Sequence, residues 1–379
     1  MFQELIGHEH IWERLLATYE GSRIAGAYLF HGPSGTGKEG MAVKFTALVN
    51  CLGDGERPCG VCPSCKKCLH LQHPNLTLIV PFPRDKNISK NSEAVKALSP
   101  KSLTRLEELL KEKGENLYAK IALPKAETIL LNSIRDLRKS IYLKAAEWGR
   151  KMILIFDAHQ LMTQQGEAGN ALLKILEEPP NNTTFILTTD HPEQLAETIL
   201  SRCHKVYFPP ISNELVEKTL ISSFKKDKPT ARLISHLAQG DFRTAQQLAQ
   251  EKLENIEYLV KQLVSWISSE TKEGWQNFLN HGIIVHQRSN QEFFNHLMFL
   301  TYWFRDAMHL QKLDGKATLI LEPMAEDIKK FVDAFPEADF SEIVMTLEMC
   351  SDSLSRHYNL NLVLINLMLD IQEQLLFRQ

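Results

Sequence analysis

The chain has 379 residues, of which 44% are hydrophobic and 23% are charged, and its formal net charge is −3. This length exceeds what one hydrophobic core usually serves, so we expect two or three domains. The weakly acidic balance argues against strong, general nucleic-acid binding by the chain alone, although it is compatible with a local basic face.

The N-terminal residues contain no basic segment followed by an apolar stretch, and the longest nearly uncharged apolar run, residues 360–369, is too short to span a bilayer. We therefore expect a cytoplasmic protein with no membrane partner. Seven cysteines should stay reduced in that compartment. Clustered cysteines then indicate a metal site rather than disulfides.

The first elements of the chain predict a strand, a glycine-rich loop and a helix. Residues 2–20 predict a short approach segment and an amphipathic helix, and residues 27–31 (AYLFH) have the pattern of a short buried strand. The loop occupies residues 32–39 (GPSGTGKE), and helical spacing follows over residues 39–47. This order directs backbone N–H groups and a helix N-terminus at phosphate oxygens.

The loop matches the phosphate-binding pattern G-x-x-x-x-G-K, and its candidate nucleotide ligands are Gly32, Gly35, Gly37 and Lys38. It departs from the pattern at the next position. The loop normally has Ser or Thr there to hold magnesium, whereas this chain has Glu39.

A cysteine-rich segment follows the helix. It contains five cysteines within 18 residues. Tetrahedral zinc takes four soft ligands, so one of the five would be spare. The last four of these cysteines, at residues 59, 62, 65 and 68, nearly match an iron–sulfur run, but the final spacing is short and no proline follows it. We interpret the cluster as a structural zinc site, with iron–sulfur ligands or uncommitted thiols as alternatives. The five cysteines are Cys51, Cys59, Cys62, Cys65 and Cys68.

The middle of the chain alternates between clear and weak patterns. Residues 76–80 (LTLIV) predict a strand. Residues 84–120 are rich in Lys, Asn, Ser and Glu, with a helical pattern only at residues 102–113, and we expect a solvated insertion. Helical spacing returns over residues 129–148.

The next strands have the apolar runs of a parallel sheet. Residues 152–156 (MILIF) form a continuous apolar run that ends at Asp157, which is typical of a central parallel strand. A helix over residues 168–178 should stop at the two following prolines, because proline has no N–H to continue it. Residues 184–189 (TFILTT) predict another buried strand.

Strand–helix alternation to about residue 208 predicts a parallel α/β domain, and Pro209-Pro210 marks its expected end. We predict no strand beyond that point. A small helical unit is expected over residues 213–250 and a larger bundle over residues 255–379, whose helices include residues 291–310 and 340–376.

The nucleotide site lacks two groups that hydrolysis needs. An active site of this type has a loop hydroxyl on magnesium and an acidic pair after a later strand. Here Glu39 replaces the hydroxyl, and Asp157 is followed by Ala158, whose methyl group cannot orient water. We predict that the chain alone is not an active ATPase. Binding of ATP or ADP without hydrolysis, and an empty glycine turn kept for packing, both stay open.

Two arginines occur where nucleotide chemistry uses them. Arg202 follows the glycine loop, the Asp strand and the Thr strand, which is the order of parts in ring-forming nucleotide hydrolases. In those proteins such an arginine reaches the γ-phosphate held by a neighbouring chain. Arg243, in residues 240–243 (GDFR), could face this chain's own loop. For both, an ordinary surface arginine is the alternative interpretation.

Several motifs together resemble the bacterial clamp-loader subunits of DNA polymerase III, the gamma/tau and delta-prime chains. The resemblance is dense over residues 1–210 and thin beyond them. It rests on residues 2–38, the cysteine segment, residues 73–76 (HPNL), 134–137 (IRDL), 170–180 (NALLKILEEPP) and 201–203 (SRC).

Within this family, the missing loop hydroxyl and the missing second acidic residue indicate which type of subunit the chain resembles. Gamma/tau chains keep the loop Thr and an Asp-Glu pair, so Glu39 and Ala158 resemble the delta-prime branch. The chain departs from the family by its insertion at residues 84–120 and by Cys68.

The resemblance implies an α/β fold combined with all-α parts. An AAA+ module with a P-loop and an inserted zinc knuckle would span residues 1–210, a small helical lid residues 211–252, and a C-terminal helical collar residues 253–379. The collar would join a hetero-pentameric ring with gamma/tau and delta subunits.

It also implies roles for single residues. Arg202 would act in trans, as an arginine finger for the ATP of an adjacent gamma/tau subunit, while the ring loads the sliding clamp onto primer-template DNA in replication. The alternative is an active gamma/tau-like ATPase in which Glu39 ligates magnesium. Zinc would be held by Cys51, Cys59, Cys62 and Cys65, with Cys68 as the spare thiol or an alternative fourth ligand.

Overall fold

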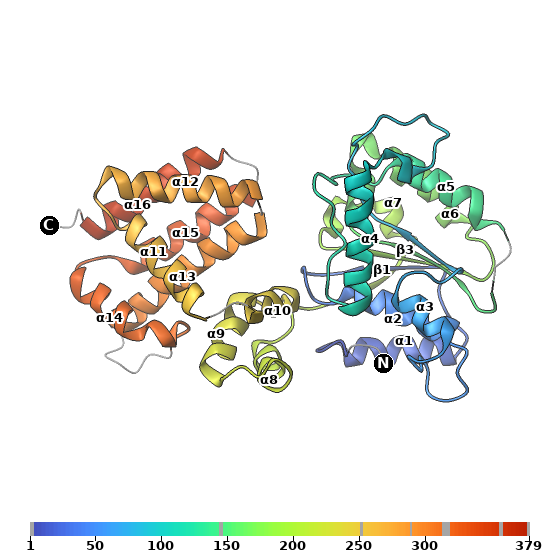
Figure 1. Cartoon of the computed structure of the whole chain (residues 1–379), viewed down its shortest axis with the longest axis horizontal. Coiled ribbons are helices and arrows are strands. Elements are labelled where there is room, and N and C mark those ends of the chain that lie inside the picture. Colours follow the sequence, from blue (N-terminus) through green and yellow to red (C-terminus); the bar gives the residue numbers. More distant parts are fainter. Residues whose placement is uncertain are drawn as a thin grey trace. The chain divides into compact units, whose positions relative to one another are not determined.

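The computed structural model describes residues 4–143, 147–250, 253–288, 290–312, 319–355 and 359–376 (Figure 1). Two compact units are present. The first consists of Met1–Ser212 and Gly240–Arg243, and the second of Asn213–Gln239 and Thr244–Gln379. The main division thus falls close to the predicted end of the α/β part.

A five-stranded parallel sheet forms the centre of the first unit, in the order β2-β3-β4-β1-β5. Every residue of β4 is buried, as expected for a parallel strand covered on both faces. The predicted parallel α/β fold is therefore confirmed. The strands are β1 (Ala27–His31), β2 (Leu76–Ile79), β3 (Lys151–Ile155), β4 (Thr183–Thr189) and β5 (His204–Tyr207).

We did not predict β5. Three of its four side chains are exposed, because it lies at the edge of the sheet and pairs with β1 alone. Without a buried apolar run it leaves no strand signal in the sequence.

Helices cover both faces of the sheet in the first unit. On one face, Phe45 of α2 packs edge-on against Tyr28 of β1, with ring centroids 5.8 Å apart. On the other face, α5, α6 and α7 share one apolar core with the strands, in which Leu137 and Leu172 are buried. The helices are α1 (Glu9–Glu20), α2 (Lys38–Asn50), α3 (Pro63–Leu69), α4 (Pro100–Glu115), α5 (Leu131–Ile141), α6 (Glu167–Glu177) and α7 (Glu197–Leu200), with short 3₁₀ turns at Ala94–Ala97, Ala158–Met162, Gln164–Gly166 and Pro192–Gln194.

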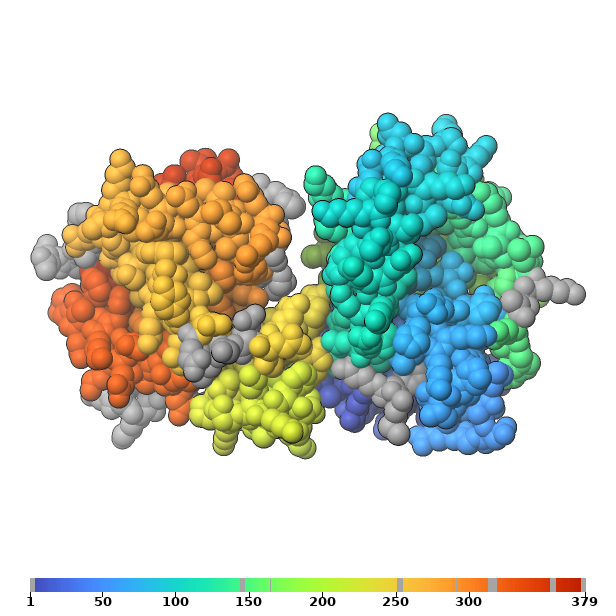
Figure 2. All heavy atoms as spheres, viewed as in Figure 1, coloured from blue at the N-terminus to red at the C-terminus, as the bar shows by residue number. Residues whose placement is uncertain are grey.

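The expectation of a solvated insertion over residues 84–120 is correct for residues 84–93, which are exposed or half-buried, but wrong for α4, which lies where the helical pattern at residues 102–113 was predicted and is packed on one face. Ser99 caps α4 by accepting a hydrogen bond from the backbone N–H of Ser102, and the helix buries Leu106, Leu109 and Lys113 on one face. Its many charged residues occupy the other faces, which explains the polar composition. Figure 2 shows this segment in teal over the front of the first unit. It is therefore part of the packed module.

The second unit is helical. One buried core joins α9 and α11 to α16 and includes Phe304, Phe340 and Met368. Its helices are α8 (Asn213–Phe224), α9 (Lys228–Ala238), α10 (Phe242–Gln250, beginning in the first unit), α11 (Leu253–Ile267), α12 (Lys272–Arg288), α13 (Asn290–Lys312), α14 (Ala325–Ala334), α15 (Phe340–Ser355) and α16 (Leu360–Leu376), with a 3₁₀ turn at Glu322–Met324.

The single helix that we predicted over residues 340–376 is two helices, α15 and α16. The side chain of Asn359 accepts hydrogen bonds from the backbone N–H groups of Asn361 and Leu362, which is a helix N-cap and starts α16 anew. The division of this part of the chain into a lid over residues 211–252 and a collar over residues 253–379 stays a prediction. Within the described ranges, no helix has both the length and the apolar character to cross a membrane.

Candidate functional site

The glycine loop turns sharply between β1 and α2, where a side chain would not fit. Gly32, Gly35 and Gly37 have φ angles of 142°, 64° and 89°. These angles favour glycine. A Cβ atom on Gly32 would lie only 2.1 Å from the carbonyl oxygen of Phe208. The turn and the N-terminus of α2 have the form of a phosphate-binding loop.

Lys38, the expected phosphate ligand, is bound to the chain's own oxygens. Its Nζ lies 2.8 Å from Oδ1 of Asp190 and donates to the carbonyl oxygens of Gly32 and Pro33. The side chain is only 5% exposed. Although burial opposes the charge of Asp190, Lys38 lowers the pKa of that carboxyl group. A carboxylate thus occupies the partner position that a phosphate would need.

Glu39 contacts a buried lysine of α4. Its Oε2 lies 2.6 Å from Nζ of Lys113, which also donates to the carbonyl oxygen of Ala119. The Lys113 side chain is 1% exposed, and burial lowers its pKa while Glu39 opposes that shift. Where the family pattern has a hydroxyl for magnesium, this chain therefore has an internal ion pair.

Asp157 has a similar partner. It follows β3, and its Oδ1 lies 3.0 Å from Nζ of Lys120. Burial opposes the charge of Lys120, but Asp157 and then Asp190 raise its pKa. The neighbouring Ala158 is fully buried and offers no acidic group. The second carboxylate that hydrolysis needs is thus absent at this position.

Arg243 reaches the same loop. Its Nη2 donates to Oγ of Ser34 at 2.8 Å and lies 3.4 Å from a carboxylate oxygen of Asp241. The loop, Arg243 and the segment after α4 enclose a cavity of about 30 Å³. Of the predicted nucleotide residues, Gly35, Gly37, Lys38, Asp157 and Arg243 line this cavity, and Gly32 contacts Lys38.

Sequence reasoning missed Lys113, Lys120 and Asp190. A signal for the first was present, because Leu106, Leu109 and Lys113 recur at helical spacing and so share one face. A lysine on an apolar face requires a buried partner. The other two carry no local signal, since only the fold brings them to the loop.

Arg202 lies in a different place from the nucleotide loop. It lines a hollow of about 440 Å³ together with residues of β1 and α6. Its guanidinium donates to the carbonyl oxygen of Thr198 at 2.8 Å and pairs with Glu177 at 2.9 Å. The side chains of Arg202 and Glu177 are 34% and 52% exposed. The arginine is accordingly accessible from outside the chain.

Four cysteines form a compact group. Backbone N–H groups donate hydrogen bonds to three of the four sulfur atoms. Such donors stabilise the charge of a thiolate, and they lower the pKa of Cys59 to about 6. Zinc–thiolate bonds of about 2.3 Å place tetrahedral sulfurs roughly 3.8 Å apart. The Sγ atoms of Cys51, Cys59, Cys62 and Cys65 all lie within 4.8 Å of one another.

This donor set fits a metal ion such as zinc, with four soft ligands and N–H donors around them. Cys68 is fully buried but does not belong to the group of four. Burial raises the pKa of Cys68 to about 12 and also raises that of Cys65, so position rather than acidity separates Cys68 from the group of four.

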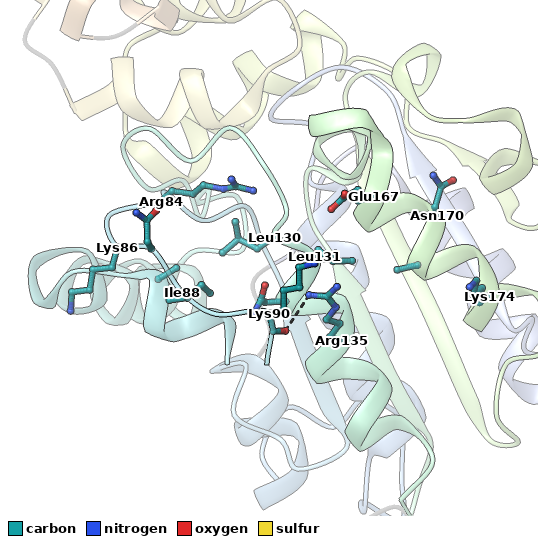
Figure 3. Close-up of a pocket in the computed structure, with 14 residues that line it drawn as sticks. Arg84, Lys86, Ile88, Lys90, Leu130, Leu131, Arg135, Glu167, Asn170 and Lys174 are labelled. Atoms are coloured by element: carbon teal, nitrogen blue, oxygen red, sulfur yellow. Dashed lines mark hydrogen bonds between the residues drawn. The ribbon is translucent and has the colours of Figure 1, made fainter. Parts of the chain in front are cut away.

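A second, basic hollow of about 620 Å³ lies elsewhere on the first unit. Figure 3 shows the loop with Arg84, Lys86 and Lys90 on one side, α6 with Lys174 on the other, and Arg135 of α5 between them. The N-terminus of α5 also lines it. The basic side chains are dispersed between residues 84 and 174, so the sequence contains no basic run that would have predicted this hollow.

A parallel five-stranded sheet with helices on both faces, together with a separate helical unit, defines the class of α/β proteins with an added all-α part. The match to known families is more specific. Residues 7–212 match the family described as "DNA polymerase III, delta subunit", and the chain belongs to that family.

Relatives agree with this assignment. The chain is 23% identical over 370 residues to DNA polymerase III subunit delta' of Bacillus subtilis, covering 96% of this chain and 95% of that protein. It is 26% identical to subunit tau of the same organism, over 66% of this chain and 38% of that one. The gamma/tau subunit of Mycobacterium tuberculosis is 31% identical over 209 residues, which is 55% of this chain and 28% of that protein.

The chain thus spans well under half of the tau relatives' length and almost all of the delta' relative. A solved gamma subunit-related protein of Thermotoga maritima aligns with 82% of this chain and 97% of its own, with 22% identity and a TM-score of 0.34. The predicted resemblance to DNA polymerase III clamp-loader subunits is confirmed by the family and its relatives.

Proposed function

We propose that this chain is a non-catalytic, delta-prime-like subunit of the bacterial DNA polymerase III clamp loader. It would stand in a five-subunit ring with gamma/tau and delta chains and assist them in placing the sliding clamp on primer-template DNA. The near full-length match to a delta' subunit supports this choice of branch. The observation that carries it is the internal neutralisation of Lys38, Glu39 and Asp157 at the nucleotide loop.

The chain itself would not hydrolyse ATP. Magnesium requires oxygen ligands that are free to bind it, and the attacking water requires a base. Glu39 and Asp157 are each paired with a lysine, and Ala158 supplies no base. A four-thiolate zinc site has no open coordination position and therefore serves structure rather than catalysis.

Arg202 would supply the chain's contribution to catalysis. Its pairing with Glu177 is an exposed ion pair, which is worth about 0–1 kcal/mol. A γ-phosphate of a neighbouring chain could replace Glu177 at small cost. An arginine finger given in trans contributes about 10³–10⁵ in rate.

Partner association has a further structural support in the second unit. Met345 and Met349 of α15 and Leu362 and Leu369 of α16 are large apolar side chains that are between 49% and 62% exposed. The two helices pack together. Exposed apolar side chains on adjoining helices are typical of an interface between subunits.

The test measures ATP turnover by the purified chain, by a gamma/tau partner and by the two together with the remaining subunits. The chain alone should show no turnover, and Arg202→Ala should lower turnover of the complex by about 10³ at one site. Lys205→Ala, an exposed cation on the adjacent strand β5, is the matched control and should change nothing.

Two results would contradict the proposal. Turnover by the chain alone at the rate of an intact site would favour the active gamma/tau-like alternative, in which Glu39 ligates magnesium. Equal turnover by complexes with Arg202 and with Ala at position 202 would exclude the role in trans.

A further inference from the structure

The proposed function requires only that the chain does not hydrolyse ATP. The contacts at the nucleotide loop go beyond a loss of hydrolysis, because side chains from four other parts of the first unit lie against the loop. Ion pairs join Lys38 to Asp190, Lys113 to Glu39 and Lys120 to Asp157, and a further one joins Arg243 to Asp241. These eight named charges cancel.

This balance of charges differs from the one in a site that binds a nucleotide. An ATP molecule brings several negative charges, and a loop of this type meets them with a free lysine and a divalent cation. Here Lys38 already has a carboxylate partner at 2.8 Å. Lys113 and Lys120 bring positive charge to Glu39 and Asp157, which stand at the two positions where a loop of this type holds magnesium. The charges that a nucleotide and its metal would supply are present in the chain.

The space is filled as well. Tyr118 places Cε1 3.1 Å from where a Cβ atom on Gly37 would lie, and its hydroxyl accepts a hydrogen bond from the backbone N–H of Ile6 at 2.9 Å. Its ring packs edge-on against Phe242, with centroids 4.8 Å apart. The carbonyl oxygen of Leu117 lies 2.9 Å from where a Cβ atom on Gly40 would lie.

The remaining cavity of about 30 Å³ has room for about one water molecule. Ligand pockets for molecules of nucleotide size measure roughly 300–1,000 Å³. Charge and volume therefore lead independently to the same conclusion.

We propose that residues 113–120 are a built-in occupant of the nucleotide loop. Lys113 and Lys120 replace the divalent cation, Asp190 replaces the phosphate on Lys38, and Tyr118 fills the space beside the loop. The chain consequently binds neither nucleotide nor magnesium there, and the loop keeps its form without either. The segment that resembles a polar insertion in the sequence has this structural task.

The first test is a calorimetric titration of the zinc-loaded full chain with ATP and with ADP, each with magnesium, to about 2 mM. We expect no binding. Magnesium chloride alone should leave the melting temperature unchanged. A dissociation constant of roughly 100 µM or tighter for either nucleotide, or a rise in melting temperature with magnesium, would overturn the proposal.

The second test removes the internal cations. The double variant Lys113→Met/Lys120→Met leaves Glu39, Asp157 and Asp190 with less positive charge around them. Magnesium should therefore raise the melting temperature of this variant. The control Lys111→Met, on the exposed face of α4, should behave as the wild type. A double variant whose melting temperature ignores magnesium would show that the lysines do not stand in for a cation.

A variant cycle covers the case in which the double variant does not fold. Lys113→Met alone should lower the melting temperature by roughly 10 °C, because it leaves a partly buried carboxylate unpaired. Adding Glu39→Gln should recover most of that loss. Additive losses in the cycle would mean that the two residues are not a functional pair, and the titration of the wild-type chain remains decisive in any case.

Discussion

The sequence and the structure lead to different interpretations of Glu39. In the sequence, Glu39 stands where a phosphate-binding loop has a hydroxyl group, and its carboxylate could still ligate magnesium. In the structure its carboxylate lies 2.6 Å from Lys113, which is 1% exposed and requires a counter-charge. The substitution at position 39 is therefore matched by a second residue 74 positions later.

The cysteine group gives a prediction at the same scale. Because four sulfurs lie within 4.8 Å and Cys68 lies outside that set, Cys62→Ala should lose the metal and Cys68→Ala should keep it. Native mass spectrometry of the two variants checks this, with one zinc expected on the wild type. Retention of zinc by Cys62→Ala, or its loss from Cys68→Ala, would contradict the ligand set. A structural site of this kind also stabilises the fold, so Cys62→Ala should melt at a lower temperature.

Single elements were predictable where they carry an apolar run or a helical period. The strands β1, β3 and β4 are buried central strands, and their sequences show it directly. The edge strand β2 was also predicted, because it has an apolar run, whereas elements with a polar or mixed surface were not fully recognised. The exposed strand β5 was missed, and the packing of α4 was missed although its helical pattern was recognised, because half of its residues are charged. A polar composition describes the outer faces of a helix and says nothing of its buried one.

The basic hollow is a feature of several elements at once, and we expect it to contact the phosphate backbone of DNA. Arg84, Lys90, Arg135 and Lys174 gather there against one acidic side chain, Glu167. The N-terminus of α5 adds partial positive charge. Phosphate is the anion that this combination fits.

We therefore expect Arg135→Ala and Lys174→Ala each to weaken binding of primer-template DNA by the assembled complex. The slope of log affinity against log salt should fall by about one for each lost phosphate contact. Lys139→Ala, on α5 but 60% exposed and paired with Asp136, is the control and should leave the slope unchanged. Equal slopes for all variants would exclude the hollow from DNA contact.

Across the whole molecule, buried histidines predict a loss of stability in mild acid. Burial lowers the pKa of His8 in the first unit and of His296 in the second to about 4, from an ordinary 6.5. At intermediate pH the unfolded chain binds these protons and the folded chain does not. Stability is therefore complete above about pH 6.5 and falls as the pH drops from there towards 4.

Each histidine should reduce the free energy of unfolding by about 2 kcal/mol between roughly pH 8 and pH 5. Denaturant unfolding at both pH values measures this. His8→Gln and His296→Gln should each flatten the dependence, whereas His10→Gln, which is exposed two residues from His8, should not. A dependence that is as steep in both buried variants as in the wild type would refute the assignment.

The sequence by itself determined the parallel α/β module, the glycine loop, the cysteine segment and the family, because these depend on local periods and short motifs whose spacing is read along the chain. Only the tertiary structure decided what fills the loop. Lys113, Lys120 and Asp190 each lie far from the loop at residues 32–39 in the sequence, and the fold brings them to it. Buried charges need partners at contact distance, and distance in space is what a sequence pattern does not contain.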